Sequence, residues 1–330
     1  MLSLIIFLLL FMLELIYFRL ADYFDIIDHP NDRSSHKVIT IRGGGVIFPL
    51  SLFLYFASYG DYSWFILGLA FISLISFWDD VKSLPNLVRI GVHVLAVTLL
   101  VLQFNIPFPA FCYPLILLLI IGTLNAYNFM DGINGITGGY SFIALVSLHY
   151  INESQSHFIN SRLIEYLLLA VAVFIFFNFR KEAKCFAGDI GSISIAFAIC
   201  FLIGKLIIHG QDVKYILLLL IYGLDTVTTI IFRMIRRENI FEAHRTHFYQ
   251  YLANELKFPQ LYVAGLYCSV QLMVNLAIIF LLPASASLWD NLMVSTFFIA
   301  VTGGIFLMLR LGVEGKERLL SPSRYNRPQL

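Results

Sequence analysis

The stretch that decides the fold class is Phe111-Cys-Tyr-Pro-Leu-Ile-Leu-Leu-Leu-Ile-Ile-Gly-Thr-Leu124, followed directly by Asn125-Ala-Tyr-Asn-Phe-Met-Asp-Gly-Ile-Asn-Gly-Ile-Thr-Gly-Gly139. The first part is an almost unbroken apolar run, in which a polar residue would be costly if the run lay in a membrane. The second part is rich in polar residues and glycine. We therefore expect a membrane helix that ends in a polar segment.

The polar segment has helical spacing at its start. If the helix continues, Asn125, Asn128 and Asp131 lie at positions i, i+3 and i+6, on one face. Gly132 and Gly135 would then end the helix in a tight turn. Two carboxamides and a carboxylate on the same face suit a hard cation and hydrogen bonds to a polar ligand.

The composition of the whole chain supports the same fold class. Of its 330 residues, 59% are hydrophobic and only 13% are charged, which lies far outside the range of soluble proteins. We predict an all-α, polytopic integral membrane protein that forms a single membrane-embedded domain over residues 1–330, because no large polar block interrupts the apolar runs. The run Leu2–Leu20 has no basic segment before it and contains Glu14, so we interpret it as a retained helix and not as a cleaved signal.

Eleven apolar runs are candidates for membrane spans. The run of residues 44–59 is short and contains Pro49. The predicted spans are residues 2–20, 44–59, 62–77, 88–104, 111–127, 138–151, 162–178, 192–209, 214–232, 260–282 and 291–310.

The basic residues predict the orientation of these spans. All but three of the 22 lysine and arginine residues fall on one side of the predicted membrane; the three are Arg162, Lys205 and Lys214. By the positive-inside rule, the N-terminus is outside, while five polar loops and the C-terminal tail are cytoplasmic. Because an error of one span would destroy this asymmetry, it also supports the count of eleven.

The five predicted cytoplasmic loops all carry polar or charged side chains of the kinds that bind metals and substrates or act in catalysis. They contain Asp28-His-Pro-Asn-Asp-Arg-Ser-Ser-His36 with Arg42-Gly-Gly-Gly45, then Asp79-Asp80, the Asn125–Gly139 segment, Gly188-Asp189-Ile-Gly-Ser192, and His244-Arg-Thr-His247. Each has a simple structural alternative. The paired aspartates could begin a solvated loop or recruit a cation. Asp189 or Ser192 could cap a helix, or Asp189 could bind Mg²⁺ beside a helix N-terminus that favours phosphate.

The last loop and the glycines leave similar alternatives open. The His-Arg-Thr-His segment fits a phosphate clamp better than a zinc site, because no cysteine or third histidine is adjacent. Arg233, Arg236 and Arg237 are interpreted as anchors at the membrane surface. Asp225 lies within a predicted span and is either a functional group or the partner of a neighbouring helix. The triple glycine at 43–45 favours close helix approach or a hinge, and the four cysteines are expected to be free thiols.

Together, these motifs resemble the polyprenyl-phosphate N-acetylhexosamine-1-phosphate transferases, also called glycosyltransferase family 4. The resemblance runs from Asp28 to Asn254 and rests on ordered motifs: Arg33-Ser-Ser-His36 with Arg42-Gly-Gly-Gly45, Asp79-Asp80 with Leu84, Asn125-x-x-Asn128-x-x-Asp131-Gly-x-Asn134-Gly135, Gly188-Asp189-x-Gly191-Ser192, Asp225-Thr226, and His244-Arg245-x-His247. Eleven spans are typical of the common-antigen and teichoic-acid branch. His-Arg-x-His followed by Tyr-Gln is closest to the branch that initiates O-antigen.

The resemblance implies a reaction and its participants. The enzyme would transfer an N-acetylhexosamine 1-phosphate from a UDP-sugar to undecaprenyl phosphate, release UMP, and initiate a lipid-linked glycan of the cell envelope, such as the O-antigen of lipopolysaccharide. It would work in the bacterial inner membrane among its lipids, with Mg²⁺ as cofactor and Mn²⁺ as an alternative. No nucleic acid partner is expected, and a homodimer is compatible with the sequence. GlcNAc, QuiNAc and FucNAc all remain open as the sugar.

The resemblance also implies roles for individual residues. The catalytic residues would be Asp79, Asp80, Asp189 and His244. The metal would be held by Asp189 with Asn128. The substrates would be bound by His36, Arg42, Asn125, Asp131, Asn134, Arg245 and His247.

Simple chemistry restricts the part that the paired aspartates play. A phosphate monoester has its second pKa near ~6, so the acceptor is mostly a dianion at neutral pH and scarcely needs a base. We therefore expect Asp79 and Asp80 mainly to organise the metal and the acceptor. The rival function is a secondary transporter or a flippase of polyprenyl-linked substrates. Transporters place polar groups near the membrane midplane and often repeat in two halves, whereas these motifs lie at the ends of the spans.

Overall fold

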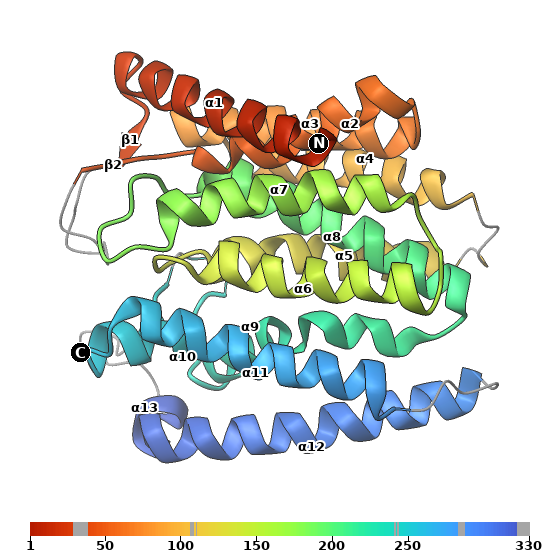
Figure 1. Ribbon diagram of the computed structural model, residues 1–330. Coiled ribbons are helices and arrows are strands. Elements are labelled where there is room, and N and C mark those ends of the chain that lie inside the picture. Colours follow the sequence, from red (N-terminus) through yellow and green to blue (C-terminus); the bar gives the residue numbers. More distant parts are fainter. Residues whose placement is uncertain are drawn as a thin grey trace.

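The computed structural model describes residues 1–28, 39–105, 109, 111–240, 242, 244–282 and 288–321. His36, one of the predicted binding residues, lies outside these ranges. The described chain is almost entirely helical (Figure 1). Its long helices are α1 (Leu2–Tyr23), α2 (Ile47–Tyr59), α3 (Ser63–Val81), α4 (Asn86–Phe104), α5 (Cys112–Met130), α6 (Ile136–Ser154), α7 (Ser161–Asn178), α8 (Gly188–Gly210), α9 (Leu220–Ile235), α11 (Gln260–Phe280) and α12 (Leu288–Glu314).

Short elements complete the chain. The strands β1 (Ile27–Asp28) and β2 (Thr40–Ile41) pair antiparallel, and Ile41 also bridges to Cys185 in the loop before α8. The remaining short helices are η1 (Gly44–Val46), η2 (Val213–Leu219), α10 (Phe248–Gln250), η3 (Tyr251–Glu255) and α13 (Lys316–Leu320).

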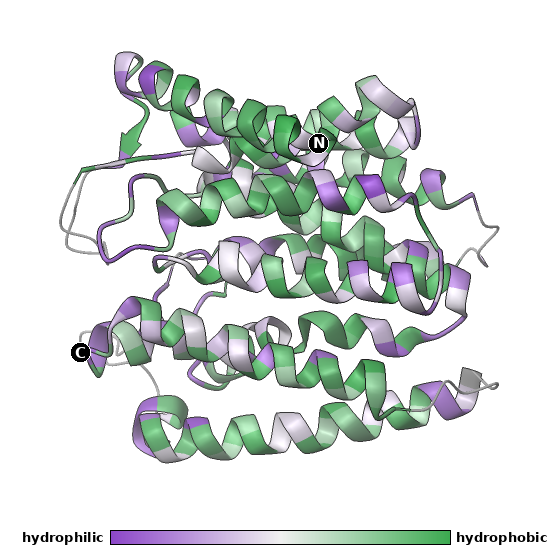
Figure 2. Cartoon of the chain, in the orientation of Figure 1, coloured by the Kyte–Doolittle hydropathy of each residue, from purple (hydrophilic) through white to green (hydrophobic). Residues whose placement is uncertain are grey.

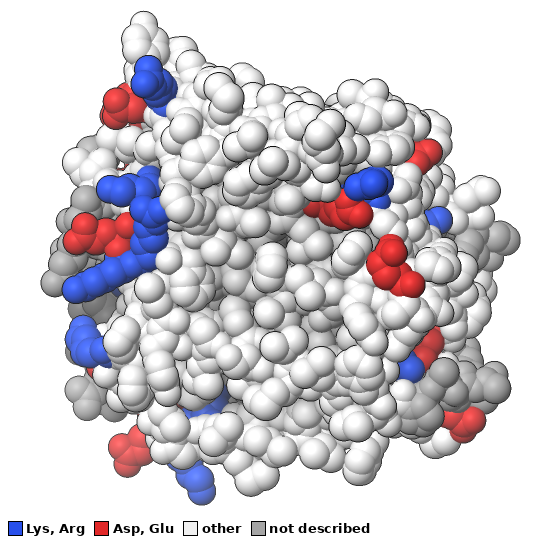
Figure 3. All heavy atoms as spheres, viewed as in Figure 1, with Lys and Arg blue, Asp and Glu red and all other residues white. Residues whose placement is uncertain are grey.

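The helices have the length and composition of membrane spans. In the described part of the chain, nine helices are apolar enough and long enough to cross a bilayer, and Gly44–Tyr59 forms a shorter apolar helix. Apolar residues run along most of the length of the helices, and charged side chains gather at the two ends of the bundle, with an uncharged band between them (Figures 2 and 3). The protein is therefore an all-α, multi-pass membrane protein. Each of the eleven predicted spans coincides with a helix, and the number of membrane crossings stays a prediction.

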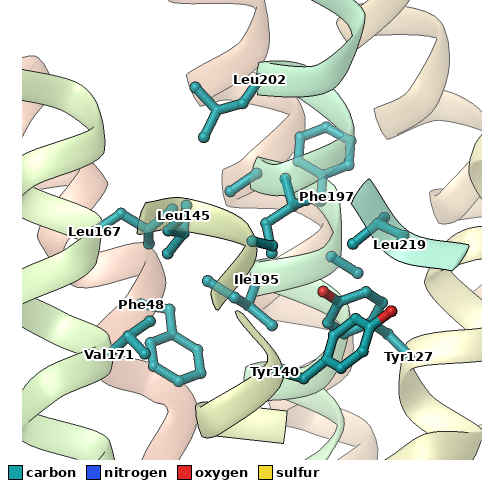
Figure 4. Packing of buried hydrophobic residues seen from close by; sticks show 14 of the residues in the cluster. Phe48, Tyr127, Tyr140, Leu145, Leu167, Val171, Ile195, Phe197, Leu202 and Leu219 are labelled. Atoms are coloured by element: carbon teal, nitrogen blue, oxygen red, sulfur yellow. The ribbon is translucent and has the colours of Figure 1, made fainter. Parts of the chain in front are cut away.

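Helix α8 forms the centre of the bundle. It is buried on nearly all sides, because its sequence is apolar around its whole circumference and its small residues let neighbouring helices approach. Phe197 and Phe201 of α8 stack against Phe65 of α3, with the Phe65 and Phe201 ring centroids 4.0 Å apart. Figure 4 shows Ile195 and Phe197 of α8 in the core, together with Tyr127 of α5 and Tyr140 of α6. This core fixes the N-terminus of α8, where a predicted site residue lies.

The polar loops that the sequence predicts on one side of the membrane do lie at one end of the bundle. The loop before α8 contacts β2 and η1, since the N–H of Gly44 donates to the carbonyl of Phe186 at 2.8 Å. The loop before α6 contacts the loop after α7 through Asn134, whose Nδ2 donates to the carbonyl of Arg180 at 3.0 Å. Figure 1 shows these loops at the left end of the bundle.

Helix α5 runs three residues beyond its predicted end. The sequence predicts residue 127 as the end of the span, but the helix continues to Met130, and Asp131 leaves the helical conformation at φ −82° and ψ 61°. Gly135 then adopts φ +85°, which only glycine does readily. The turn after Asp131 reverses the chain into α6, as the glycine pattern predicts.

Candidate active site

The carboxylate of Asp80 is the centre of a charged cluster at this end of the bundle. It accepts hydrogen bonds from the Nε of Arg42 at 2.7 Å, from the N–H of Asp189 at 2.9 Å and from the N–H of Ile190 at 2.9 Å. Asp80 therefore caps the N-terminus of α8 from a different helix. Its side chain is completely buried. The solvated loop start that the sequence left open is thus not what the structure shows.

Arg89 of α4 extends the cluster from Asp79 to Asp189. Its Nη1 lies 2.9 Å from an oxygen of Asp79, and its Nη2 lies 3.2 Å from an oxygen of Asp189. The other oxygen of Asp79 accepts the N–H of Leu84 at 2.7 Å, which fixes the turn after α3. Three carboxylates are thus brought together and held by two arginines, Arg42 and Arg89.

The charge of Arg42 is stabilised by this arrangement. Besides its bond to Asp80, its Nη2 lies 3.7 Å from Asp189. Burial opposes the charge of the guanidinium, but the neighbouring carboxylates of Asp80 and Asp189 outweigh it and raise the pKa of Arg42. Arg42 therefore stays charged and could meet an anionic ligand while still paired.

Close backbone contact between the first loop and α8 places these groups. A Cβ on Gly45 would lie 2.2 Å from the Cα of Gly191, and a Cβ on Gly188 would lie 2.6 Å from a carboxylate oxygen of Asp80. Gly188 has φ +71°, so both space and conformation require glycine there. The triple glycine therefore allows close approach, one of the two functions that the sequence left open.

A cavity of about 590 Å³ adjoins the charged cluster. This volume is in the range of small-molecule sites. Arg89 belongs to both the cluster and the cavity wall. The walls come from α4, α5, α9 and the loop after α9, and the lining residues are Asn86, Arg89, Ile90, His93, Asn125, Asn128, Phe129, Ile230, Ile240, Glu242, His244 and His247.

The predicted polar face of α5 divides into two parts. Asn125 and Asn128 line the cavity, and Asn125 also donates from Nδ2 to the carbonyl of Ile121 at 2.9 Å. Asp131 lies past the helix end, where its carboxylate accepts the hydroxyl of Thr137 at 2.6 Å and does not line the cavity. Burial raises the pKa of Asp131 to about 6. The sequence predicts Asn125, Asn128 and Asp131 on one helix face. This is wrong for Asp131, because α5 ends one residue before it.

Asn134 joins two loops. Its Nδ2 donates to the carbonyls of Arg180 and Lys181 at 3.0 and 3.2 Å, and its N–H donates to Oε1 of Gln260 at 3.0 Å. These contacts use both hydrogens of the carboxamide. The structure therefore gives Asn134 a role in loop docking, and its predicted role towards the nucleotide stays a prediction.

The His-Arg-Thr-His segment presents two stacked imidazoles to the cavity. The rings of His244 and His247 lie 5.0 Å apart, and each is about 6 Å from the ring of Phe129. Burial is the main cause that lowers the pKa of His244, to about 3, so its ring is neutral at pH 7. Arg245 lies between the two histidines and is half-buried.

Asp225 lies directly behind this segment. Its carboxylate accepts the N–H groups of Phe248 and Tyr249 at 2.9 and 3.1 Å, and lies 3.4 Å from Nδ1 of His247. The structure thus confirms the expected pairing of Asp225 with a neighbouring helix, through Tyr267 of α11, and a functional role for Asp225 stays a prediction.

The arginines that follow Asp225 do more than anchor the chain at a membrane surface. The guanidinium of Arg233 is buried and donates to the carbonyls of Asn239, Ile240 and Glu242 at 2.6, 3.3 and 3.2 Å. Arg236 donates to Glu238 at 2.7 Å. Besides the anchoring expected from the sequence, which stays a prediction, these two residues organise the loop that leads to His244.

The donor groups fit a magnesium ion that also binds substrate. Among the described residues, no three His, Cys, Asp or Glu side chains are spaced to enclose a metal by themselves. Mg²⁺ commonly uses one or two carboxylates plus substrate phosphates and water. Asp189 offers a partly exposed carboxylate, and Asn128 offers a carboxamide oxygen at the cavity wall. These two residues are compatible with the predicted metal site.

Several lining residues were not identified from the sequence. Asn86, Arg89 and His93 share one face of α4 at spacings of three and four residues, a signal that the sequence carries. His93 is buried and its Nε2 has no hydrogen-bond partner in the described structure. Arg89 follows Asp80 by nine positions, and from the sequence it is assigned only to the basic side of the membrane. Helical spacing could have placed it beside the cavity.

Comparison of the sequence with known proteins finds a match to one family model. The sequence model of glycosyl transferase family 4 matches residues 62–207, which include the aspartate pair, the Asn125–Gly139 segment and Asp189. A Bacillus subtilis protein named "Probable undecaprenyl-phosphate N-acetylglucosaminyl 1-phosphate transferase" is 25% identical over 324 residues, covering 90% of this chain and 87% of that protein.

Relatives of a second kind match shorter segments. A phospho-N-acetylmuramoyl-pentapeptide-transferase of Heliobacterium modesticaldum is 34% identical over 93 residues, which cover 28% of this chain and 29% of that protein. The Petrotoga mobilis protein of the same name is 30% identical over 197 residues, which cover 50% of this chain and 60% of that protein. The order of the motifs, the family match and these relatives agree, and the chain is similar to glycosyl transferase family 4 over residues 62–207.

Proposed function

We propose that the protein transfers an N-acetylhexosamine 1-phosphate from a UDP-sugar to undecaprenyl phosphate and releases UMP. The observation that carries this proposal is the charged cluster of Asp79, Asp80 and Asp189, joined through Arg89 to a cavity of about 590 Å³. Asparagine and histidine side chains line the cavity beside the cluster. The names of the Bacillus and Heliobacterium relatives support the same class of reaction.

The reaction joins two anionic phosphates. A phosphate oxygen of the lipid acceptor attacks the phosphorus that carries the sugar, and the bond between that phosphorus and the oxygen of UMP breaks. The products are a lipid diphosphate sugar and UMP. The acceptor oxygen needs no base, since its second pKa is near ~6. Reducing the repulsion between the two phosphates is therefore the principal task of the site.

The residues of the cluster can perform that task. Mg²⁺ held by Asp189 and Asn128 would supply positive charge across the donor diphosphate. Arg42 and Arg89 hold the three carboxylates together through ion pairs, and Arg89 also places a positive charge at the wall of the cavity. The neutral ring of His244 can donate or accept a hydrogen bond but carries no charge at pH 7.

Asp80 is poorly placed to take a proton from the acceptor. Both of its oxygens already accept hydrogen bonds, from Arg42, Asp189 and Ile190. This supports the expectation that Asp80 organises the site. The N–H groups of Asp189 and Ile190 at the start of α8 donate to Asp80. A phosphate at this helix N-terminus would therefore need another hydrogen-bond donor.

The proposal places the protein in the bacterial inner membrane with this end of the bundle in the cytoplasm, where UDP-sugars are available. The His-Arg-x-His and Tyr-Gln residues favour the branch that initiates O-antigen. The sugar is proposed only as an N-acetylhexosamine, because GlcNAc, QuiNAc and FucNAc differ by hydroxyl groups that one loop contact can distinguish.

The test is UMP release by the purified full-length protein, with undecaprenyl phosphate and Mg²⁺ and a panel of UDP-sugars. We expect release with at least one UDP-N-acetylhexosamine, dependence on the lipid acceptor, and loss of activity with EDTA or in Asp189→Ala. Asp212→Ala, which removes a buried carboxylate at the opposite end of the bundle, is the control and should remain active. Activity that survives both EDTA and Asp189→Ala would contradict the metal-dependent mechanism.

A further inference from the structure

Arg310, near the end of α12, is buried inside the protein. An arginine near the end of a membrane helix usually extends towards the membrane surface instead. The side chain of Arg310 is 1% exposed, although α12 itself lies at the periphery and presents most of its surface outward. Such a group needs several partners, because a charge buried without them is expensive. Its partners therefore indicate why it is there.

The guanidinium of Arg310 connects α12 to α9 and to the His-Arg-Thr-His segment. Its Nη1 donates to the hydroxyls of Thr228 and Thr229, both at 2.8 Å. Its Nη2 donates to the backbone carbonyl of Thr246 at 2.7 Å. Its Nε donates to Glu314 at 2.5 Å, one helical turn further along α12.

Asp225 holds the same segment from its other end. It accepts the N–H groups of Phe248 and Tyr249, and it also accepts the hydroxyl of Tyr267 from α11 at 2.6 Å. Arg310 lies 3.8 Å from the Asp225 carboxylate. The backbone from Thr246 to Tyr249 is thus fixed by one buried cation and one buried anion.

His247 lies between these two points of attachment. Its ring contacts Asp225 and stacks on His244, and both rings line the cavity. A shift of the Thr246 carbonyl would move both imidazoles, because Thr246 lies between His244 and His247 in the chain. The geometry of the two histidines therefore depends on groups that do not themselves line the cavity.

We propose that Arg310 and Asp225 are positioning residues that hold the His244–Tyr249 segment in its cavity-lining conformation. The peripheral helix α12 is then part of the machinery of the site, through one guanidinium. This inference rests on the proposed function only for its effect on the reaction. The effect on the segment itself is independent of any activity.

The matched control is a second buried ion pair. Nζ of Lys214 lies 3.0 Å from the Asp212 carboxylate, with both side chains buried, at the end of the bundle away from the cavity. Lys214→Gln and Arg310→Gln both remove a buried cation from an ion pair. A loss of general stability should therefore affect both variants, whereas an effect on the histidine segment should be confined to Arg310→Gln.

The experiment measures the modification of His247 by diethyl pyrocarbonate, located by mass spectrometry, in the full-length protein in detergent. His247 is almost completely buried, so the wild type should react slowly. We expect Arg310→Gln to react at least about tenfold faster at His247, since a charge-assisted hydrogen bond of the usual strength is lost. Lys214→Gln should react at the wild-type rate.

A second variant keeps the test decisive if Arg310→Gln does not yield folded protein. Arg310→Lys retains the charge, but an ammonium group lacks the planar, forked geometry that lets the guanidinium reach the Thr246 carbonyl and both threonine hydroxyls. His247 should therefore again become more reactive. UMP release provides the second readout, and we expect kcat/KM to fall at least about tenfold in the same variants. An unchanged rate of His247 modification in Arg310→Lys would overturn the proposal. If the wild type releases no UMP but His247 is still protected by Arg310, the proposed function fails and the positioning role stands.

Discussion

Asp80→Asn is the substitution that most directly separates organisation from base catalysis. The asparagine has nearly the same shape, but one carboxylate oxygen becomes an NH₂ group and the negative charge is lost. If the remaining oxygen keeps the bonds from Arg42 and Asp189, the N–H of Ile190 faces another donor. If the side chain turns over, Arg42 and Asp189 lose their acceptor. One orientation cannot satisfy all three donors.

The expected loss can be estimated from these bonds. A buried N–H left without an acceptor costs about 1–3 kcal/mol, and a hydrogen bond to a charged group contributes about 1.5–3 kcal/mol. Loss of a negative charge at a helix N-terminus adds roughly 0.3–1 kcal/mol. If about 2.7 kcal/mol of this total is expressed in the transition state, kcat/KM falls ~100-fold. We also expect a lower melting temperature.

The assay is the pH dependence of UMP release between about pH 6 and pH 10. If Asp80 organises the site, Asp80→Asn should remain about 100-fold slower at every pH, because hydroxide cannot restore a helix cap. Recovery of the rate at high pH would refute the reasoning, since it would mean that a lost base had been replaced. Asp212→Asn is the matched control, because Asp212 also accepts a helix N-terminal N–H, that of Lys214, and pairs with a cation. It should lower stability and leave kcat/KM near the wild-type value.

Three further outcomes are expected. Gly45→Ala should prevent the close contact with Gly191 and abolish activity, whereas Gly91→Ala, at a position with open space, should be tolerated, as judged by size-exclusion profile and UMP release. Arg89→Gln should lower the Mg²⁺ concentration that gives half-maximal activity while reducing kcat, because a cation that competes for Asp189 is removed; a higher Mg²⁺ requirement would contradict this. Asp131→Asn should raise the melting temperature at pH 7.5, because the folded pKa of about 6 lies above the ordinary value of 3.8 and ionisation therefore disfavours the folded state. This gain should disappear as pH falls from above 6 towards 4, and a gain that persists at pH 4 would exclude ionisation as its cause.

The helices could be predicted from the sequence because each is an apolar run bounded by polar or glycine residues. The gathering of the charged loops at one end followed from the distribution of basic residues. Helical spacing predicted that Asn125 and Asn128 share one face of the helix, and the structure shows that this face lines the cavity. These features depend on local patterns, which are visible in a single sequence.

The parts that could not be predicted depend on contacts between distant segments. Asp80 as the cap of α8 joins residues more than one hundred positions apart, and no local pattern indicates it. Arg310 looked like one more basic residue at the membrane surface, but its partners lie on α9 and in the loop before α10. Asp131 was misplaced because a helix end is uncertain by a residue or two, and one residue is enough to turn a side chain away.

The cap formed by Asp80 also sets an order in the biosynthesis of the protein. The N–H groups that Asp80 accepts belong to residues 109 and 110 positions later in the chain. At about 5–20 residues per second, they emerge from the ribosome roughly 5–20 s after α3. Arg42 is made before Asp80, so the ion pair can form first and accompany the carboxylate while α3 enters the membrane. Arg42 is thus available as a partner for Asp80 before α8 is made, and the finished protein has that contact.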